Sequence, residues 1–126
     1  MLGELAEDDT IILCDMEAGV GTLLRMQPGD VDLVLVIAEA TAKSLDVARR
    51  AAEIATERSS VLIVGNRVRD EEDAERIRTV FSGRELVLIP EDPAIHEAER
   101  EGRAPIDVDP GAPGVRAIIG IANRLA

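Results

Sequence analysis

The chain has 126 residues, a formal net charge of −11 and a hydrophobic fraction of 46%. This length fits a single domain over 1–126, built around one core. The acidic balance argues against nucleic acid or an anionic membrane surface as a partner, because both bind basic surfaces. No signal-peptide pattern and no apolar run long enough to span a bilayer occurs, so we expect a cytoplasmic protein.

Several residue types occur once, and this limits the chemistry. Phe81 is the lone aromatic residue, so the core must be aliphatic, and Lys43 is the lone lysine. Cys14 is the lone cysteine, which excludes an internal disulfide and a cysteine metal cluster within one chain. Because Cys14 lies in an apolar run, we expect it to be buried. His96 has no second imidazole or thiol nearby in the sequence and is expected on the surface.

Four nearly continuous aliphatic runs predict strands, at 10–14, 31–37, 61–64 and 86–89. Runs that do not alternate with polar residues are typical of parallel strands with helices on both faces.

Helical patterns separate these runs, at 44–57, 70–81, 92–102 and 115–125. Asp70 and Asp92 are predicted N-caps, and Gly102 is the predicted end of the third helix. Alternating strands and helices predict an α/β fold, a mainly parallel sheet with helices on both faces.

Ligands of open α/β sheets bind at the carboxyl ends of the strands, so residues directly after each run are candidates. Asp15, Glu17 and Gly19 follow the first run. An aspartate that closes an apolar strand is the Walker B arrangement, which holds Mg²⁺ beside the phosphates of a nucleotide. An ordinary acidic turn between strand and loop is the alternative explanation.

Asn66 and Arg67 follow the third run. An asparagine in this place can pair with an adenine edge, and the stem of an arginine can cover the ring. A turn that tolerates unusual backbone angles is the alternative. After the fourth run, the segment Pro90, Glu91 and Asp92 would line a base pocket, or would be only the start of a helix.

These segments, in this order, resemble the MinD/ParA-type deviant Walker P-loop ATPases. The form Asp15-Met16-Glu17-Ala18-Gly19, together with 40–45, 65–69 and 89–92, looks most like the CooC-type branch. MinD and ParA usually carry proline before the alanine-glycine pair. CooC-type proteins are associated with nickel insertion into carbon monoxide dehydrogenase. The resemblance covers nearly the whole chain, but only the second half of a family member.

The resemblance implies a role for each segment. Asp15 would be the Mg²⁺ aspartate, and Glu17 to Gly19 would be the switch II segment. Asn66 and Arg67 would recognise adenine, assisted by the loop from Pro90 to Asp92. ATP and Mg²⁺ are therefore the implied cofactors, and carbon monoxide dehydrogenase is an implied partner. Nothing in this chain supports nickel binding, since the paired cysteines of CooC proteins would lie upstream.

The phosphate-binding loop of this family is missing from the sequence. No Gly-Lys-Ser/Thr occurs, and Ala42-Lys43-Ser44 lacks the glycines of a P-loop. In this family the P-loop strand lies between the Walker B strand and the strand at 31–37, so an empty slot is expected in the sheet. The flanking strands could close on each other, a second copy could fill the slot, or a front-half polypeptide that carries the P-loop could do so. We expect the chain not to be a lone monomer.

Two functions follow from these patterns. The first is a fragment or split half of a CooC/MinD-like ATP-binding protein, which has no ATPase activity alone. The alternative is a non-enzymatic, homo-oligomeric interaction or regulatory module that has lost nucleotide chemistry, and tight ATP binding by the chain would exclude it. A phosphoacceptor receiver domain would also explain Asp8, Asp9 and a strand-end aspartate. It needs a lysine after a late strand, however, and Lys43 follows the second.

Overall fold

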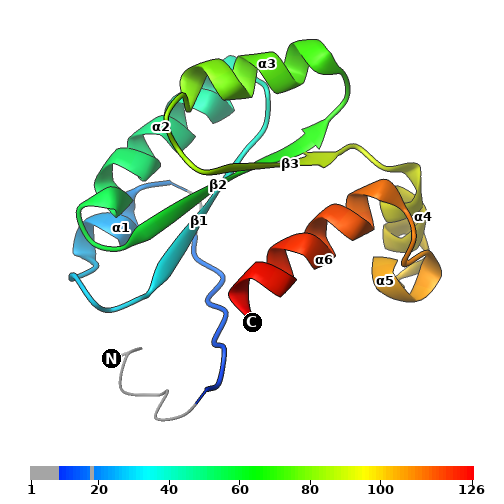
Figure 1. The fold of residues 1–126 in the computed structure, drawn as a ribbon, viewed down its shortest axis with the longest axis horizontal. Coiled ribbons are helices and arrows are strands. Elements are labelled where there is room, and N and C mark those ends of the chain that lie inside the picture. The colour runs from blue at the N-terminus through cyan, green and yellow to red at the C-terminus, as the bar shows by residue number, and fades with distance from the viewer. Residues whose placement is uncertain (1–8, 18) are drawn as a thin grey trace.

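A parallel sheet of three strands, in the order β1-β2-β3, is the centre of this computed structural model, which describes residues 9–17 and 19–126 (Figure 1). The strands are β1 (Leu33–Ala38), β2 (Ser60–Val68) and β3 (Leu86–Pro90). Leu33 pairs with Ser60, and Ile63 pairs with Leu86. Three of the four predicted strands therefore form, and the prediction of a parallel sheet is confirmed.

Six helices are found in the described part of the chain: α1 (Gly21–Arg25), α2 (Ala42–Thr56), α3 (Glu71–Val80), α4 (Pro93–Glu101), α5 (Pro105–Val108) and α6 (Pro113–Leu125). The predicted caps are confirmed. Asp70 accepts the amide of Asp73, Asp92 accepts the amide of Ala94, and Gly102 ends α4 with φ 67°. None of the described helices has the length and apolar character needed to cross a bilayer.

The helices cover the two faces of the sheet unequally (Figure 1). Under α2 and α3 lies the larger core cluster, which includes Val34, Val36, Ile63, Ile77 and Phe81. Under α6 lies a smaller cluster, formed by Leu62, Val64, Ile89 and Ile121. On this second face the side chains of β1 are less well covered, and Ile37 is 55% exposed. Helices on both faces were predicted, and this is confirmed, but the α6 face is incomplete at β1.

The prediction of a first strand at 10–14 is wrong, because these residues form no strand. Ile11 is 53% exposed and Leu13 is 79% exposed. Cys14 is exposed as well, so the prediction that it is buried is also wrong. The physical reason is the lack of a paired neighbour: β1 is paired with β2 alone among the described strands, and residues 10–14 do not join its outer edge.

Candidate functional site

The carboxyl ends of β2 and β3 bring two of the predicted segments together. Val68 pairs with Pro90, and the amide of Glu91 donates to the carbonyl of Val68 at 2.9 Å. Asn66 and Pro90 therefore lie at the same edge of the sheet, as the strand-end rule predicts. For Asp15 the premise of this prediction fails, because no strand precedes it, and its place relative to this edge stays a prediction.

A β-bulge contains Asn66 and Arg67. Gly65 is paired with Leu88 and Val68 with Pro90, so two residues of β2 stand opposite one residue of β3. Arg67 has φ 55° and is the one non-glycine residue with positive φ in the described ranges. A left-handed conformation costs about 1–2 kcal/mol for such a residue. Strain of this kind persists where surrounding contacts hold it, and it is frequent at functional sites.

Glycine permits a close approach at the start of this bulge. A Cβ at Gly65 would lie 2.6 Å from Cδ2 of Leu88 and 3.0 Å from Cδ1 of Ile77. The absent side chain lets α3 and β3 pack closely against β2 directly before Asn66.

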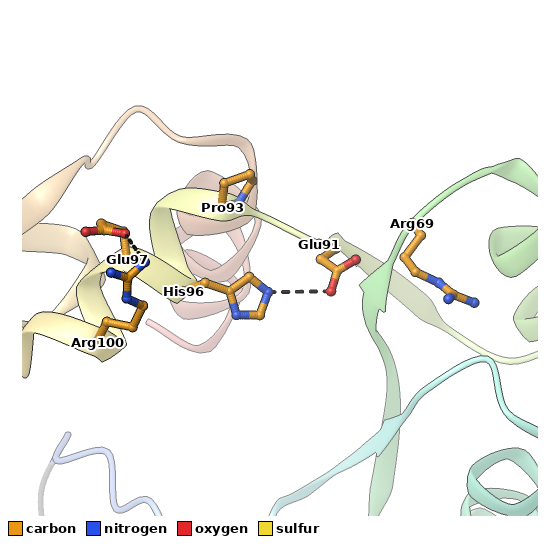
Figure 2. A pocket seen from close by; sticks show the side chains of 6 residues that line it. All are labelled: Arg69, Glu91, Pro93, His96, Glu97 and Arg100. Atoms are coloured by element: carbon orange, nitrogen blue, oxygen red, sulfur yellow. Dashed lines mark hydrogen bonds and ion pairs between the residues drawn. The ribbon is translucent and has the colours of Figure 1, made fainter.

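Arg67 joins the ends of all three strands. Its Nη1 lies 3.5 Å from Oε1 of Glu39, which follows β1, and its Nη2 lies 3.4 Å from Oε1 of Glu91, which follows β3. The same oxygen of Glu91 lies 3.5 Å from Nε2 of His96, as the dashed line in Figure 2 shows. By contrast, the half-buried side chain of Asn66 has no hydrogen-bond partner within the described residues.

A shallow hollow of about 450 Å³ lies beside this edge (Figure 2) and is lined by Arg69, Glu91, Pro93, His96, Glu97 and Arg100. Its arginines are already paired. Nε of Arg69 donates to Oδ2 of Asp73 at 2.9 Å, and Nη1 of Arg100 donates to Oε2 of Glu97 at 3.2 Å. The guanidinium and backbone amide of Arg69 lower the pKa of Asp73, which is 5% exposed. Both arginines of the hollow therefore have a carboxylate partner, and neither is left to bind a phosphate.

Asp92, which the sequence offered as a base-pocket residue or a helix cap, is a structural residue. It is 6% exposed, its Oδ1 accepts the amide of Ala94 at 2.9 Å, and its Oδ2 accepts the amide of Gly114 at 2.7 Å. One carboxylate therefore binds the first turns of both α4 and α6. Both of its oxygens accept hydrogen bonds from these amides.

The switch II candidates lie at a second hollow, along the outer edge of β1. This groove of about 540 Å³ is lined among others by Glu17, Gly19, Leu35, Ile37, Thr41 and Lys43. Glu17 and Gly19 are thus beside the start of α2. Asp15 does not line the groove, and its carboxylate is exposed.

The start of α2 is an ordinary capped helix and not a phosphate loop. Oγ1 of Thr41 accepts the amide of Ser44 at 3.2 Å, and Oγ of Ser44 accepts the amide of Glu39 at 2.9 Å. One of the helix amides that could bind a phosphate oxygen is therefore already bonded. This geometry agrees with the sequence argument against a P-loop around Lys43.

The described residues fit a nucleotide in part. Asn66 offers a base an amide that has no hydrogen-bond partner among the described residues, but the glycine-rich loop whose amides bind a phosphate is missing from the sequence. No group of three His, Cys, Asp or Glu side chains in the described ranges is placed to hold a metal ion. The role of Asp15 in Mg²⁺ binding stays a prediction.

Sequence reasoning missed Glu39, although the signal was present. Glu39 comes directly after the second aliphatic run, so the same strand-end rule that selected Asn66 and Glu91 also selects Glu39.

The chain was compared with known proteins. No protein-family model matches it. It is similar to an uncharacterized ATP-binding protein of Methanocaldococcus jannaschii, with 32% identity over an alignment of 107 residues that covers 80% of this chain and 41% of the relative. The septum site-determining protein MinD of Pyrococcus horikoshii, complexed with Mg-ADP, matches 76% of this chain and 42% of its own, with a TM-score of 0.63 and 24% identity. The MinD cell division protein of Aquifex aeolicus matches 76% and 44%, with a TM-score of 0.60 and 24% identity.

The structural matches show the fold. The chain has part of the MinD-like P-loop NTPase fold, as its motifs predicted. It spans less than half the length of each of these relatives.

Proposed function

We propose that this chain is the adenine-binding half of a MinD-like ATP-binding protein, and that it binds ATP when a P-loop from outside these 126 residues completes the site. The observation that carries the proposal is the bulge at the carboxyl edge, where the side-chain amide of Asn66 has no hydrogen-bond partner among the described residues and lies beside a strained Arg67. The similarity to an ATP-binding protein and to MinD supports the choice of a nucleotide.

The base would bind across the ends of β2 and β3. The amide of Asn66 has a donor and an acceptor, which match the donor and acceptor on an adenine edge. The Arg67 side chain is 54% exposed, so its stem is free to lie over a ring. Pro90 and Glu91 would form the wall of this subsite.

The phosphates would bind residues that this chain lacks. The arginines beside the carboxyl edge have carboxylate partners, and the amide of Ser44 at the start of α2 is bonded to Thr41. The missing P-loop would supply a lysine and the amides that hold phosphate oxygens. Asp15 would hold Mg²⁺, which neutralises phosphate charge, and Glu17 to Gly19 would lie beside the terminal phosphate.

The outer edge of β1 is where we propose that the missing half binds. Leu33–Ala38 contains no charged residue and no proline, the devices that usually protect a free edge. The face beside it is also uncovered, with Ile37 55% exposed and Ile118 of α6 46% exposed. A strand added to this edge would pair its backbone groups, and a helix following that strand would cover the face. The missing half would be a preceding stretch of the same polypeptide or a separate one.

We further propose that the protein belongs to the CooC-like branch, on the motif at 15–19, and acts in the cytoplasm with carbon monoxide dehydrogenase as its client. Any nickel would be bound by residues outside this chain. Measuring the nickel content of that dehydrogenase in cells with and without the protein would test this part.

Adenosine is the probe that tests base binding by the chain alone, because it has no phosphate. We expect adenosine to shift the side-chain amide signal of Asn66 in nuclear magnetic resonance spectra. Asn66→Ala should abolish binding, and Asn123→Ala, an exposed asparagine on α6, should leave it unchanged. Equal adenosine binding by both variants would contradict the proposed base subsite.

A homo-oligomeric module is the second candidate, and the same free edge of β1 favours it. The exposed run at 10–14 could supply a strand to the edge of a second copy. This candidate predicts self-association without adenosine binding.

A further inference from the structure

Two glutamates at the ends of β1 and β3 hold the arginine of the bulge between them. Nη1 of Arg67 faces Glu39 at 3.5 Å and Nη2 faces Glu91 at 3.4 Å. The guanidinium thus spans the carboxyl edge of the whole described sheet, from its first strand to its third.

Both glutamates project from fixed backbone. The amide of Glu39 donates to Oγ of Ser44 at 2.9 Å, and the amide of Glu91 donates to the carbonyl of Val68 at 2.9 Å. The backbone of Glu39 is therefore tied to the first turn of α2, and that of Glu91 to the end of β2. A guanidinium bound from both sides is oriented by the sheet itself.

The bulge needs such an orientation. The strand ladder fixes Gly65 and Val68 but leaves the two residues between them out of register. Asn66 makes no side-chain hydrogen bond to any described residue, so it does not hold its own position. The left-handed backbone of Arg67 is unfavourable by itself. Within the described residues, the ion pairs found for the side chains of this two-residue segment are those with the two glutamates.

We propose that Glu39 and Glu91 are positioning residues: by holding Arg67 across the sheet edge, they keep the bulge in the conformation that presents Asn66 to its ligand. The identity of that ligand, an adenine base, rests on the proposed function. A single exposed ion pair of this length contributes little, but two carboxylates on one guanidinium restrict a side chain that either alone would leave mobile. Nε2 of His96 lies 3.5 Å from Oε1 of Glu91, so His96 extends the series of contacts formed by Glu39, Arg67 and Glu91.

The test compares nuclear magnetic resonance signals of the full chain in four variants. In Glu39→Ala/Glu91→Ala we expect the Cα and carbonyl signals of Arg67 to leave their left-handed positions and the side-chain amide of Asn66 to shift. Glycine adopts the left-handed region without help, so Arg67→Gly should keep the bulge without the glutamates. Adding the double substitution to Arg67→Gly should then leave the Asn66 signals unchanged. Glu72→Ala, which breaks an exposed pair with Arg76 on α3, is the matched control and should change neither signal.

Two results would overturn the proposal. One is a double variant whose Arg67 and Asn66 signals stay at their original positions, which would mean that the ladder alone holds the bulge. The other is an equal shift of Asn66 in the Arg67→Gly background, which would mean that the glutamates do not act through Arg67. The same samples titrated with adenosine should show a several-fold higher Kd for the double variant. If adenosine binds none of them, the proposed function fails, and the comparison of signals still decides the positioning role.

Discussion

The joint between α4 and α6 depends on one glycine. A Cβ at Gly114 would lie 2.8 Å from Cβ of Asp92 and 2.9 Å from Cδ1 of Ile95. It would also disturb the 2.7 Å hydrogen bond from the Gly114 amide to Asp92. The side chain of Asp92 is therefore unavailable for the base, and its contribution to the site is to fix the corner after β3.

We predict that Gly114→Ala lowers the free energy of unfolding by about 1–3 kcal/mol, because the methyl group overpacks a closed contact. Urea denaturation followed by circular dichroism measures this. Gly120→Ala is the matched control, since Gly120 lies in the same helix with no atom within 4 Å of a new Cβ. The control should stabilise the chain by about 0.5–1 kcal/mol. A Gly114→Ala variant as stable as Gly120→Ala would show that the joint tolerates the methyl group.

Asp73 makes stability depend on pH. Its pKa is lowered by the hydrogen bonds from Arg69, so the folded state favours the charged carboxylate. The stabilisation is present above the unfolded pKa of about 4 and is lost as the pH falls through the lower folded pKa. We predict that Asp73→Asn is less stable than the unaltered chain at neutral pH, and that the difference shrinks in acid below about pH 4. A difference that stays constant in urea titrations from neutral to acid pH would contradict this.

At the scale of elements, local sequence patterns predicted the longer helices and the paired strands, because these depend on neighbouring residues. The helical patterns, the caps at Asp70 and Asp92 and the aliphatic runs of β1, β2 and β3 were sufficient to place α2, α3, α4, α6 and the parallel sheet. The short α1 and α5 were not predicted, because one turn of helix shows no periodicity. β2 extends to Val68, beyond the predicted end at 64, because the bulge restores pairing with β3.

The sequence correctly placed the site residues at the carboxyl ends of β2 and β3. It failed for the run at 10–14, which forms no strand. Asn66 and Pro90 reached one edge because β2 and β3 pair with each other. The run at 10–14 has strong strand character, but a strand is stabilised by its neighbour, and sequence alone does not supply one. The ion pairs of Arg67 join residues 28 and 24 positions away, and no local pattern indicates them.

We predict that amide hydrogens at 10–14 exchange rapidly in the chain alone, whereas those of the central strand β2 are the best protected. The reason is that β2 has strands on both sides and 10–14 forms no strand. Hydrogen exchange measured by nuclear magnetic resonance decides this. Slow exchange at 10–14 in a monomer would mean that this run pairs with β1 within the same chain.

At the scale of the whole molecule, the free edge of β1 predicts self-association of the chain without its missing half. Sedimentation at tens of micromolar protein should give a mass above the 13.5 kDa of one chain. Ile37→Lys should shift the equilibrium toward the monomer, because a lysine protects a strand edge. Val80→Lys, at an exposed position on α3, should not. A clean mass of one chain would instead show that this edge is stable when uncovered.

We also predict no ATPase activity for the chain alone. The described arginines beside the carboxyl edge are paired with carboxylates, and the lysine and amides that stabilise a transferring phosphoryl group are missing from the sequence. A colorimetric phosphate assay measures this. Turnover that Asp15→Ala abolishes, in a preparation free of contaminating ATPase, would overturn the prediction.

The most direct test of the central claim is a calorimetric titration of Mg-ADP into the chain alone and into the chain joined to a P-loop-bearing front half. If this chain contributes the base subsite and the front half contributes the phosphate subsite, the chain alone shows no tight binding. The joined protein binds, and Asn66→Ala weakens that binding at least tenfold, which corresponds to about 1.4 kcal/mol. Tight binding by the chain alone, or an Asn66→Ala variant of the joined protein that binds as the unaltered one does, would contradict the account.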